Sequence, residues 1–354
     1  MTEAYRQALE NVIYLTACAV NGNAPDRARV NAMDLTQLCQ AAGRHLLTAA
    51  VASTLESVGV RDPQFQQAKA KAMRKNAILD ADRSALLQKL EEAGIWYMPL
   101  KGALLQKLYP RYGMRQMADN DILFDAARAG DVKGIMEAMG FTAASFDSKN
   151  DDIYYKPPVS NFELHRGLFG TIHEEKLYRY YKDVKKRLVK DKGNNYGFHF
   201  TDEDFYLYMV AHEYKHYSGG GTGLRSLLDT YVYLQKKTAL NFSYIEEETE
   251  RLGITDFERL NRALALHLFS GEKLTDEERK MLDYLLSSGT YGTLQNGIHH
   301  KISSLGRWGY LKDRVFFPMD RMKENYPVLC RFPVLLPVCW VHRWFVGLFI
   351  KRKK

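Results

Sequence analysis

Hydrophobic and polar positions follow a helical spacing over the N-terminal quarter of the chain. Residues 34–58 are rich in Ala, Leu and Gln and contain no proline, a composition that favours helices. Asp62-Pro63 is typical of a helix start, because proline fits the first helical turn. A long helical pattern follows and ends at Gly94, a residue that favours the turn after a helix. The pattern predicts an N-terminal helical region, which we place at residues 1–88.

After this region the pattern changes to short apolar runs separated by turns. The first run, IWYMPL at 95–100, is apolar and aromatic and suits a buried strand. Alternating strands and helices followed by paired strands predict an α/β unit, which we place at residues 89–200. Its further strands are expected at 121–124, 152–156 and 160–165, and its helices at 103–109 and 128–139.

The helical pattern returns at Asp202 and continues through most of the remaining chain. Residues 205–217 and 224–237 are helical stretches, and a glycine cluster separates them. We place this C-terminal helical region at residues 201–354. The predicted fold class is α+β, with a small mixed-sheet core flanked by helical regions on both sides.

The chain of 354 residues has a formal net charge of +8, and the excess is local. Residues 182–192 hold six basic residues against two acidic ones, and residues 351–354 read KRKK. Basic surfaces suit polyanions such as nucleotides, nucleic acids or acidic membrane surfaces. Charge alone does not choose among these partners, and a solvated helix face with a solubilising tail is the alternative.

Cysteine usage and the N-terminus indicate where the protein works. The four cysteines, Cys18, Cys39, Cys330 and Cys339, form no CxxC pair. So few cysteines in a chain of this length indicate a reduced, intracellular protein. The sequence MTEAYRQALE lacks a basic region followed by an apolar run, so no signal peptide is predicted. We expect a cytoplasmic location.

Residues 328–350 are strongly apolar, but Arg331, His342, Arg343 and two prolines interrupt them. No uninterrupted apolar run of about 18 residues exists there, so a transmembrane helix is not predicted. We expect this segment to pack on the protein's own core. The alternative is peripheral membrane contact, because aromatic residues such as Trp340 and the basic tail suit a lipid headgroup boundary.

The sharpest local feature is the acidic pair in ADNDILFD at 118–125. Alternate side chains of a strand share a face, so Asp119 and Asp121 point the same way. Acids are poor strand residues, and two on one face indicate a cation between them. For the D-x-D pattern alone, a solvated strand edge is the alternative.

Three neighbouring features favour a metal and phosphate site. Lys101-Gly102 lies between a strand and a helix start, where glycine lets the backbone approach a phosphate and lysine adds positive charge. Arg115, just before the acidic pair, suits a carboxylate or a triphosphate. NFELH puts Glu163 and His165 on one strand face, so Glu163 completes a set of three acids if the two strands are neighbours. Such a set is repulsive without metal ions.

A family resemblance joins these motifs to the C-terminal helices. PLKGALLQKLYP, RQMADNDILF, NFELHRGL and AHEYKHYSGGGTGLRSLLDTYVYL together resemble an uncharacterised family of bacterial nucleotidyltransferases in the polymerase-β superfamily. The resemblance covers most of the chain, from about residue 30 to 345. The matching positions are Lys101, Gly102, Arg115, Asp119, Asp121, Glu163, His165, His212, Lys215, His216, Arg225 and Asp229.

The resemblance implies a polymerase-β-type core and transfer of a nucleoside monophosphate from a nucleoside triphosphate, such as ATP, with release of pyrophosphate. Asp119, Asp121 and Glu163 would be the catalytic residues and would hold two Mg²⁺ ions. The acceptor would be a protein, an RNA, a sugar or a small molecule. The other expected nucleotide-site residues are Lys101, Gly102, Arg115, His165, His212, His216, Arg225 and Asp229.

Two alternatives come from other classes of protein. HEYKH at 212–216 matches the H-E-x-x-H helix of zinc hydrolases, in which both histidines bind zinc and the glutamate acts as base. Lys215 counts against zinc, because it puts a cation inside the motif. The second alternative is a catalytically silent nucleotide-binding or interaction protein.

Overall fold

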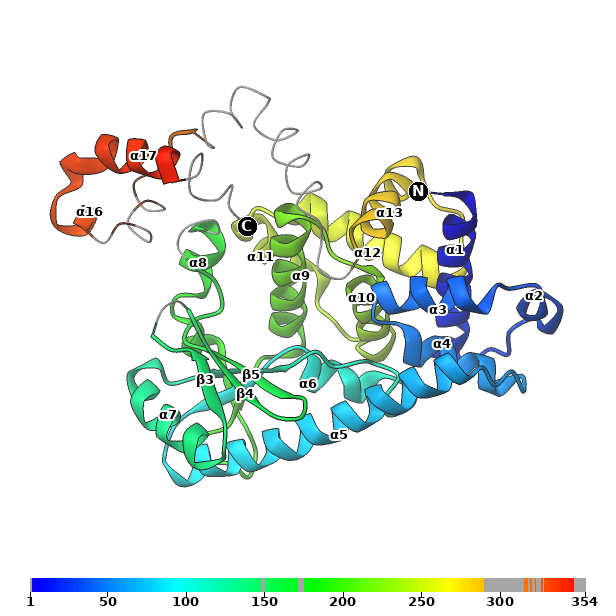
Figure 1. Cartoon of the computed structure of the whole chain (residues 1–354), viewed down its shortest axis with the longest axis horizontal. Helices are drawn as coiled ribbons and strands as arrows, with labels where there is room; N and C mark the ends of the chain where they lie inside the picture. The colour runs from blue at the N-terminus through cyan, green and yellow to red at the C-terminus, as the bar shows by residue number, and fades with distance from the viewer. Residues whose placement is uncertain are drawn as a thin grey trace.

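The central sheet of the computed structural model has the strand order β1-β2-β5-β4-β3 (Figure 1). β2 and β5 are parallel, whereas the other neighbouring pairs are antiparallel. The predicted small mixed sheet is therefore confirmed. The strands are β1 Tyr97–Pro99, β2 Asn120–Phe124, β3 Thr142–Ser145, β4 Asp151–Lys156 and β5 Ser160–His165. The structure describes residues 2–147, 150–170, 175–289, 315–317, 319, 322, 326 and 328–346.

Side-chain alternation gives the sheet two apolar faces. Ile122 of β2 and Phe162 of β5 belong to a cluster that is completed by the long helix α5 (Pro63–Glu92) and by α7 (Ala129–Ala138). Leu123 belongs to the opposite face, where it packs in a cluster with α9 (Asp202–Gly219). Asp121 shares the face of Leu123, because the two residues are two positions apart on one strand.

The helices from the two ends of the chain share one hydrophobic core. Leu9 and Leu15 from α1 are fully buried in the same cluster as Leu228 from α10 and Leu264 from α12. The sequence pattern did not predict this pairing, because it depends on contacts between opposite ends of the chain. The helices are α1 Glu3–Asn21, α2 Arg27–Asn31, α3 Leu35–Arg44, α4 Thr48–Ser57, α8 Glu175–Tyr181, α10 Leu224–Lys236, α11 Phe242–Leu252, α12 Thr255–Ser270 and α13 Asp276–Ser288.

Most predicted elements lie within a few residues of the observed ones, and the differences have local causes. The helical stretch at 34–58 is divided into α3 and α4, where Leu46 adopts a positive φ of 54°. The strand β3 was not predicted, because its sequence TAAS has little apolar alternation. The short remaining elements are α6 Gly102–Leu105, η1 Gln106–Leu108, η2 Ala126–Arg128, η3 Val184–Arg187, β6 Val189–Lys190 and β7 Phe198–His199.

The basic stretch 182–192 is largely exposed but is not one continuous helix face. It contains the short helix η3 and the strand β6. Arg187 donates hydrogen bonds to Asp204 (3.1 Å) and Glu248 (2.7 Å). One basic residue of the stretch therefore binds acids of the same chain.

The C-terminal segment differs from the expectation that it packs on the main core. It consists of α16 (Val328–Arg331), η4 (Pro333–Leu335) and α17 (Leu336–Phe345). Among the described residues, its buried side chains form a cluster of their own around Leu329 and Cys339. No helix in the described part of the chain is long and apolar enough to cross a membrane. The basic tail 351–354 lies outside the described residues.

Helix α5 holds the loop and the strand that carry the acidic pair. Asn76, fully buried on α5, donates to the Arg115 carbonyl (2.9 Å) and accepts from the Met117 amide (3.1 Å). Three residues beyond Met117, Asn120 accepts from Arg83 (2.9 Å) and donates to a carbonyl of α5 (2.9 Å). The middle residue of the Asp-Asn-Asp sequence thus anchors the strand, while its neighbours point to the other face.

Replacing Asn76 with Ala should lower the free energy of unfolding by about 1–3 kcal/mol, because two buried backbone groups lose their partner. Urea denaturation measures this loss. The control is Gln67→Ala on the exposed side of the same helix, which should stay within about 0.5 kcal/mol of the parent. Equal stability of the two variants would show that Asn76 does not hold the loop.

Candidate active site

A cavity of about 300 Å³ lies where β2, β5, α9 and α10 meet. All but one of the site residues expected from the sequence line this cavity. The exception, His165, is hydrogen bonded to a carboxylate in its wall. The expected residues in the wall are Lys101, Gly102, Arg115, Asp119, Asp121, Glu163, His212, His216, Arg225 and Asp229.

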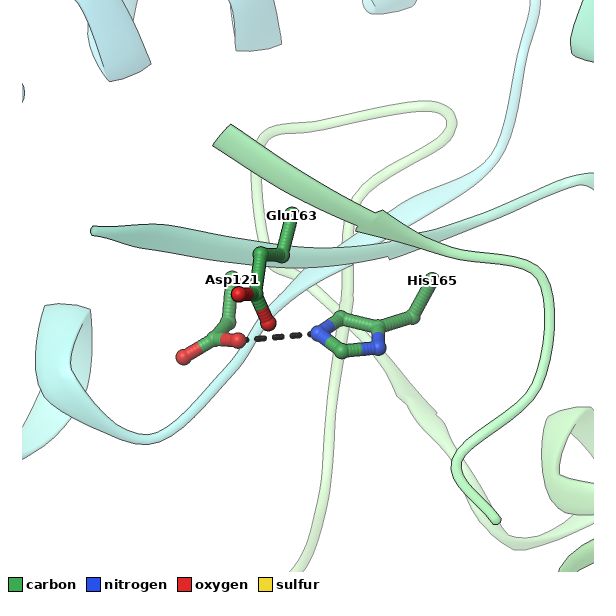
Figure 2. A group of neighbouring side chains, drawn as sticks. All are labelled: Asp121, Glu163 and His165. Atoms are coloured by element: carbon green, nitrogen blue, oxygen red, sulfur yellow. Dashed lines mark hydrogen bonds and ion pairs between the residues drawn. The ribbon is translucent and has the colours of Figure 1, made fainter. Parts of the chain in front are cut away.

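The parallel pairing of β2 and β5 brings the acids together. Asp121 is the register partner of Glu163, and Leu123 is the partner of His165. Asp119 lies two residues before Asp121, just ahead of the strand. Figure 2 shows the Asp121 and Glu163 carboxylates directed into one space, with the His165 ring beside them. Acids far apart in sequence thus share one side of the sheet, because β2 and β5 are neighbours, a condition that the sequence left open.

Asp121 is surrounded by groups that favour its charged form. His165 donates from Nε2 to its Oδ1 (2.8 Å), and the Lys101 ammonium lies 3.7 Å from the same oxygen. Burial raises the pKa of Asp121, but Lys101, His165 and Arg115 outweigh it and hold this pKa well below its usual range. Asp121 is therefore a buried but ionised carboxylate.

The other two acids lack this compensation. Burial, followed by the charges of Asp121 and Glu163, raises the pKa of Asp119 to about 6. Burial and Asp121 also raise the pKa of Glu163. One ligand atom each from Asp121, Glu163 and His165 lies within 4.8 Å of the others. An oxygen-rich set with excess negative charge fits a hard divalent cation such as Mg²⁺ or Mn²⁺.

The turn before α6 directs a cation toward these acids. Lys101 has φ of 32° and ψ of −101°, a conformation that non-glycine residues rarely adopt. Its ammonium donates to His212 Nε2 (2.7 Å) as well as lying beside Asp121. At Gly102, an added Cβ would lie 2.7 Å from the Met117 side chain and 2.8 Å from Arg115. Any larger residue at position 102 would have to displace the ends of the Met117 and Arg115 side chains.

Arg115 and Asp229 form a buried bidentate ion pair. Nε donates to one carboxylate oxygen (2.7 Å) and Nη2 to the other (2.8 Å). The Tyr109 hydroxyl donates to the same carboxylate at 2.7 Å. This pair joins the loop before β2 to α10 and engages most donors of the guanidinium.

Arg225 is a second arginine in the cavity wall; it is half-buried, and fewer of its donors have partners. Its Nη1 donates to the Gln116 carbonyl (3.1 Å), whereas its buried Nε has no partner among the described residues. Burial and the charge of Arg115 lower the pKa of Arg225. An arginine with a buried, unpartnered Nε in a cavity wall is suited to an anion in that cavity.

The HEYKH helix has little room for zinc. His212 Nε2 and His216 Nε2 lie 3.1 Å apart, but the Lys101 ammonium is bonded to His212 Nε2. Burial raises the pKa of Glu213 to about 7, and this side chain accepts from Asn261 (2.9 Å). Within the described ranges, the one group of three side chains that could hold a metal ion is Asp121, Glu163 and His165, and it includes neither His212 nor His216. The geometry favours the carboxylate cluster as the cation site.

A larger cavity, of about 580 Å³, lies beyond the carboxyl ends of β2 and β5. Aromatic and basic side chains such as Trp96, Phe169 and Lys182 line it, and the described carboxylates in its wall are those of Asp125 and Asp183. None of the site residues expected from the sequence belongs to it. We therefore place the candidate active site in the smaller cavity, where carboxylates and cations converge.

Sequence comparison identifies the family of the chain. A family profile described as an uncharacterised nucleotidyltransferase matches residues 31–270, more than half of the chain. The chain belongs to this nucleotidyltransferase family. The resemblance seen in the sequence motifs is thereby confirmed.

Similarity of the chain to known proteins outside the family profile is low. A solved structure described as an antigenic nucleotidyltransferase-like protein from Paracoccidioides brasiliensis is similar to the chain, with 18% sequence identity and a TM-score of 0.35. The similarity covers 54% of this chain and 92% of that chain. No curated protein sequence matches the chain.

The candidate site also uses residues that the sequence did not single out. Asn76 and Tyr109 hold the loop and the ion pair, and Thr222 and Ser226 line the cavity with a hydrogen bond of 2.7 Å between their hydroxyls. The only local signal was the turn GGGTGLRS before α10, which places Thr222 and Ser226 beside Arg225.

Replacing Arg115 with Met should lower the free energy of unfolding by about 3–5 kcal/mol, because it leaves the Asp229 carboxylate buried without its cation. The double variant R115M/D229L should lose less than the sum of the two single losses, since it removes both charges. Chemical denaturation of all four proteins measures this coupling. Additive losses would contradict the pairing.

Proposed function

We propose that this nucleotidyltransferase depends on a divalent cation, transfers a nucleoside monophosphate from a nucleoside triphosphate to an acceptor, and releases pyrophosphate. The observation that carries the proposal is the register of β2 and β5, which pairs Asp121 with Glu163. Asp119 adds a third acid, and Lys101 and Arg225 add cations to the same cavity. Family membership supports the reaction class.

Electrostatics support a cation at the three carboxylates. The raised pKa values of Asp119 and Glu163 show that the folded chain does not by itself compensate their charges. In the proposal, Asp119 and Asp121 hold one Mg²⁺ ion with the triphosphate, and Glu163 contributes to a second. Bound there, the ions would offset phosphate charge and polarise the α-phosphoryl group.

The bond changes follow from this placement. An acceptor oxygen or nitrogen forms a bond to the α-phosphorus, and the bond from that phosphorus to the pyrophosphate oxygen breaks. The acceptor loses a proton as it attacks. Glu163 lines the cavity beside the proposed cations, so its carboxylate is placed to hold a cation there or to help the acceptor lose that proton.

The two arginines receive different roles in the proposal. Arg225 contacts the triphosphate, because its buried Nε has spare hydrogen-bonding capacity in the cavity wall. Arg115 positions the loop that leads to Asp119, because Asp229 and Met117 occupy its donors. Lys101 acts beside Asp121 as a fixed positive charge. His165 orients the Asp121 carboxylate through its hydrogen bond.

A thermal-shift panel tests the proposal. The protein is heated with ATP, CTP, GTP or UTP, each with and without Mg²⁺, because a ligand of the folded state raises Tm. We expect a Mg²⁺-dependent rise that names the preferred base and is lost in D119N/D121N. Pyrophosphate release then separates a transferase from a silent nucleotide-binding protein. No rise with any nucleotide would contradict the proposal, and a rise with Zn²⁺ that His212→Ala abolishes would favour the zinc alternative.

Asp119→Asn alone should stabilise the metal-free protein and weaken its binding of the cation. Above about pH 6 and without metal, it should raise the free energy of unfolding by about 1–3 kcal/mol, because it removes a buried charge whose pKa is raised to about 6. The gain should shrink as the pH falls through 6 and disappear below the unfolded pKa of 3.8, where the parent carboxyl is protonated in both states. The same variant should lose the Mg²⁺-dependent nucleotide shift.

Denaturation at several pH values and the thermal-shift panel measure the two effects of Asp119→Asn. The matched control is Asp131→Asn, an exposed acid on α7, which should change neither. Loss of stability on Asp119→Asn without metal would show that the carboxylate is already compensated in the folded chain.

Arg225→Ala should weaken nucleotide binding by about tenfold or more, since a charge-assisted contact to phosphate is worth roughly 1.5–3 kcal/mol. Titration of the Mg²⁺–nucleotide complex measures its Kd. The exposed Arg259 gives the control, because Arg259→Ala removes a similar side chain far from the cavity wall. An unchanged Kd in a folded Arg225→Ala protein would remove Arg225 from the phosphate site.

A further inference from the structure

The apolar side chains on the inner face of the C-terminal segment pack against one another. Leu329 and Cys339 are buried in a cluster built from residues between 317 and 340. The Trp340 indole donates to the Phe317 carbonyl (2.8 Å), and the Trp344 indole donates to the Val315 carbonyl (2.8 Å). In Figure 1, α16 and α17 (red) lie apart from α1 and the other helices of the main body. The segment therefore does not need the main core to bury its tryptophans.

Its outer face is apolar and exposed. Val334, Val338 and Val341 are 82%, 64% and 58% exposed. Their spacing of four and three residues puts them on one side of the helix. Phe332, just before η4, is 49% exposed and extends the patch. Elsewhere in the described chain up to residue 289, no helix or strand has more than one exposed large apolar residue. A contiguous apolar stripe on a folded protein indicates a binding surface.

Charge decides which partner fits this stripe. Residues 325–354 contain six Lys or Arg residues and no Asp or Glu. Arg331 and Arg343 lie within the described segment, and the other four form the KRKK sequence. An apolar stripe with cationic neighbours matches a bilayer that contains anionic lipids. A second copy of the same segment fits poorly, because pairing would bring two groups of positive charge together.

The size of the helix decides how it would bind. α17 has 10 residues, a length of about 15 Å, whereas the hydrocarbon core of a bilayer is about 30 Å thick. The segment is therefore suited to lie in the headgroup region, with the valines toward the acyl chains.

We propose that the outer face of residues 332–341 binds the surface of an anionic lipid bilayer and attaches the nucleotidyltransferase to it peripherally. The proposal is independent of the reaction and of the nucleotide site.

Vesicle co-sedimentation tests the proposal with the full chain. The probes are vesicles of phosphatidylcholine alone and vesicles with about 30 mol % phosphatidylglycerol. The parent protein should sediment with the anionic vesicles and release at high salt. V338E/V341E should reduce the partition coefficient by about tenfold or more, because two valines are replaced by anions. The matched control is Val189→Glu on β6, a valine that is 43% exposed, and it should bind like the parent.

Each remaining outcome overturns the proposal. Equal binding of the parent and V338E/V341E would show that the valines do not contact the bilayer. Equal binding to neutral and anionic vesicles would show that the basic residues do not contribute. A dimer that V338E/V341E converts to a monomer, without vesicle binding by the parent, would assign the stripe to a second copy. Unchanged thermal unfolding of the variants shows that they fold, and the nucleotide-dependent shift reports separately on the proposed reaction.

Discussion

The site depends on the repulsion between acids that the parallel pairing of β2 and β5 forces together. Asp121 faces Glu163 across the strand pair, and Asp119 lies two residues before Asp121. Lys101 and His165 compensate Asp121, but the raised pKa of Asp119 shows that compensation is incomplete. A cation would remove the excess charge. The uncompensated charge therefore lowers the stability of the folded chain without a cation, and it supports the proposed metal and phosphate site.

The rest of the fold resists that repulsion by holding the acidic strand from two sides. α5 fixes the loop and the strand through Asn76 and Asn120. α10 holds the same loop through the Arg115–Asp229 pair. Since α10 shares a core with the N-terminal helices, the site is tied to the whole helical body rather than to the sheet alone. This explains why a small sheet can carry so much buried charge.

Positive charge has two separate uses along the chain. Lys101, Arg115 and Arg225 line the cavity that contains the acids; Arg115 is buried, and the other two are half-buried. In residues 325–354, by contrast, the basic residues accompany an exposed apolar stripe and no acid. The first arrangement suits a small, highly charged ligand in a defined geometry, and the second suits an extended surface with diffuse charge. A formal net charge of +8 does not distinguish the two.

Local patterns in the sequence determined the helices at both ends, most of the strands and the shared face of Asp119 and Asp121, because periodicity and turn propensity act between near neighbours. Motif resemblance then identified the residues of the cavity. Only the tertiary structure decided that β2 adjoins β5, that Asp229 engages Arg115, and that the two helical regions share one core. Those outcomes depend on contacts between residues far apart in the chain, whose energies no local pattern encodes.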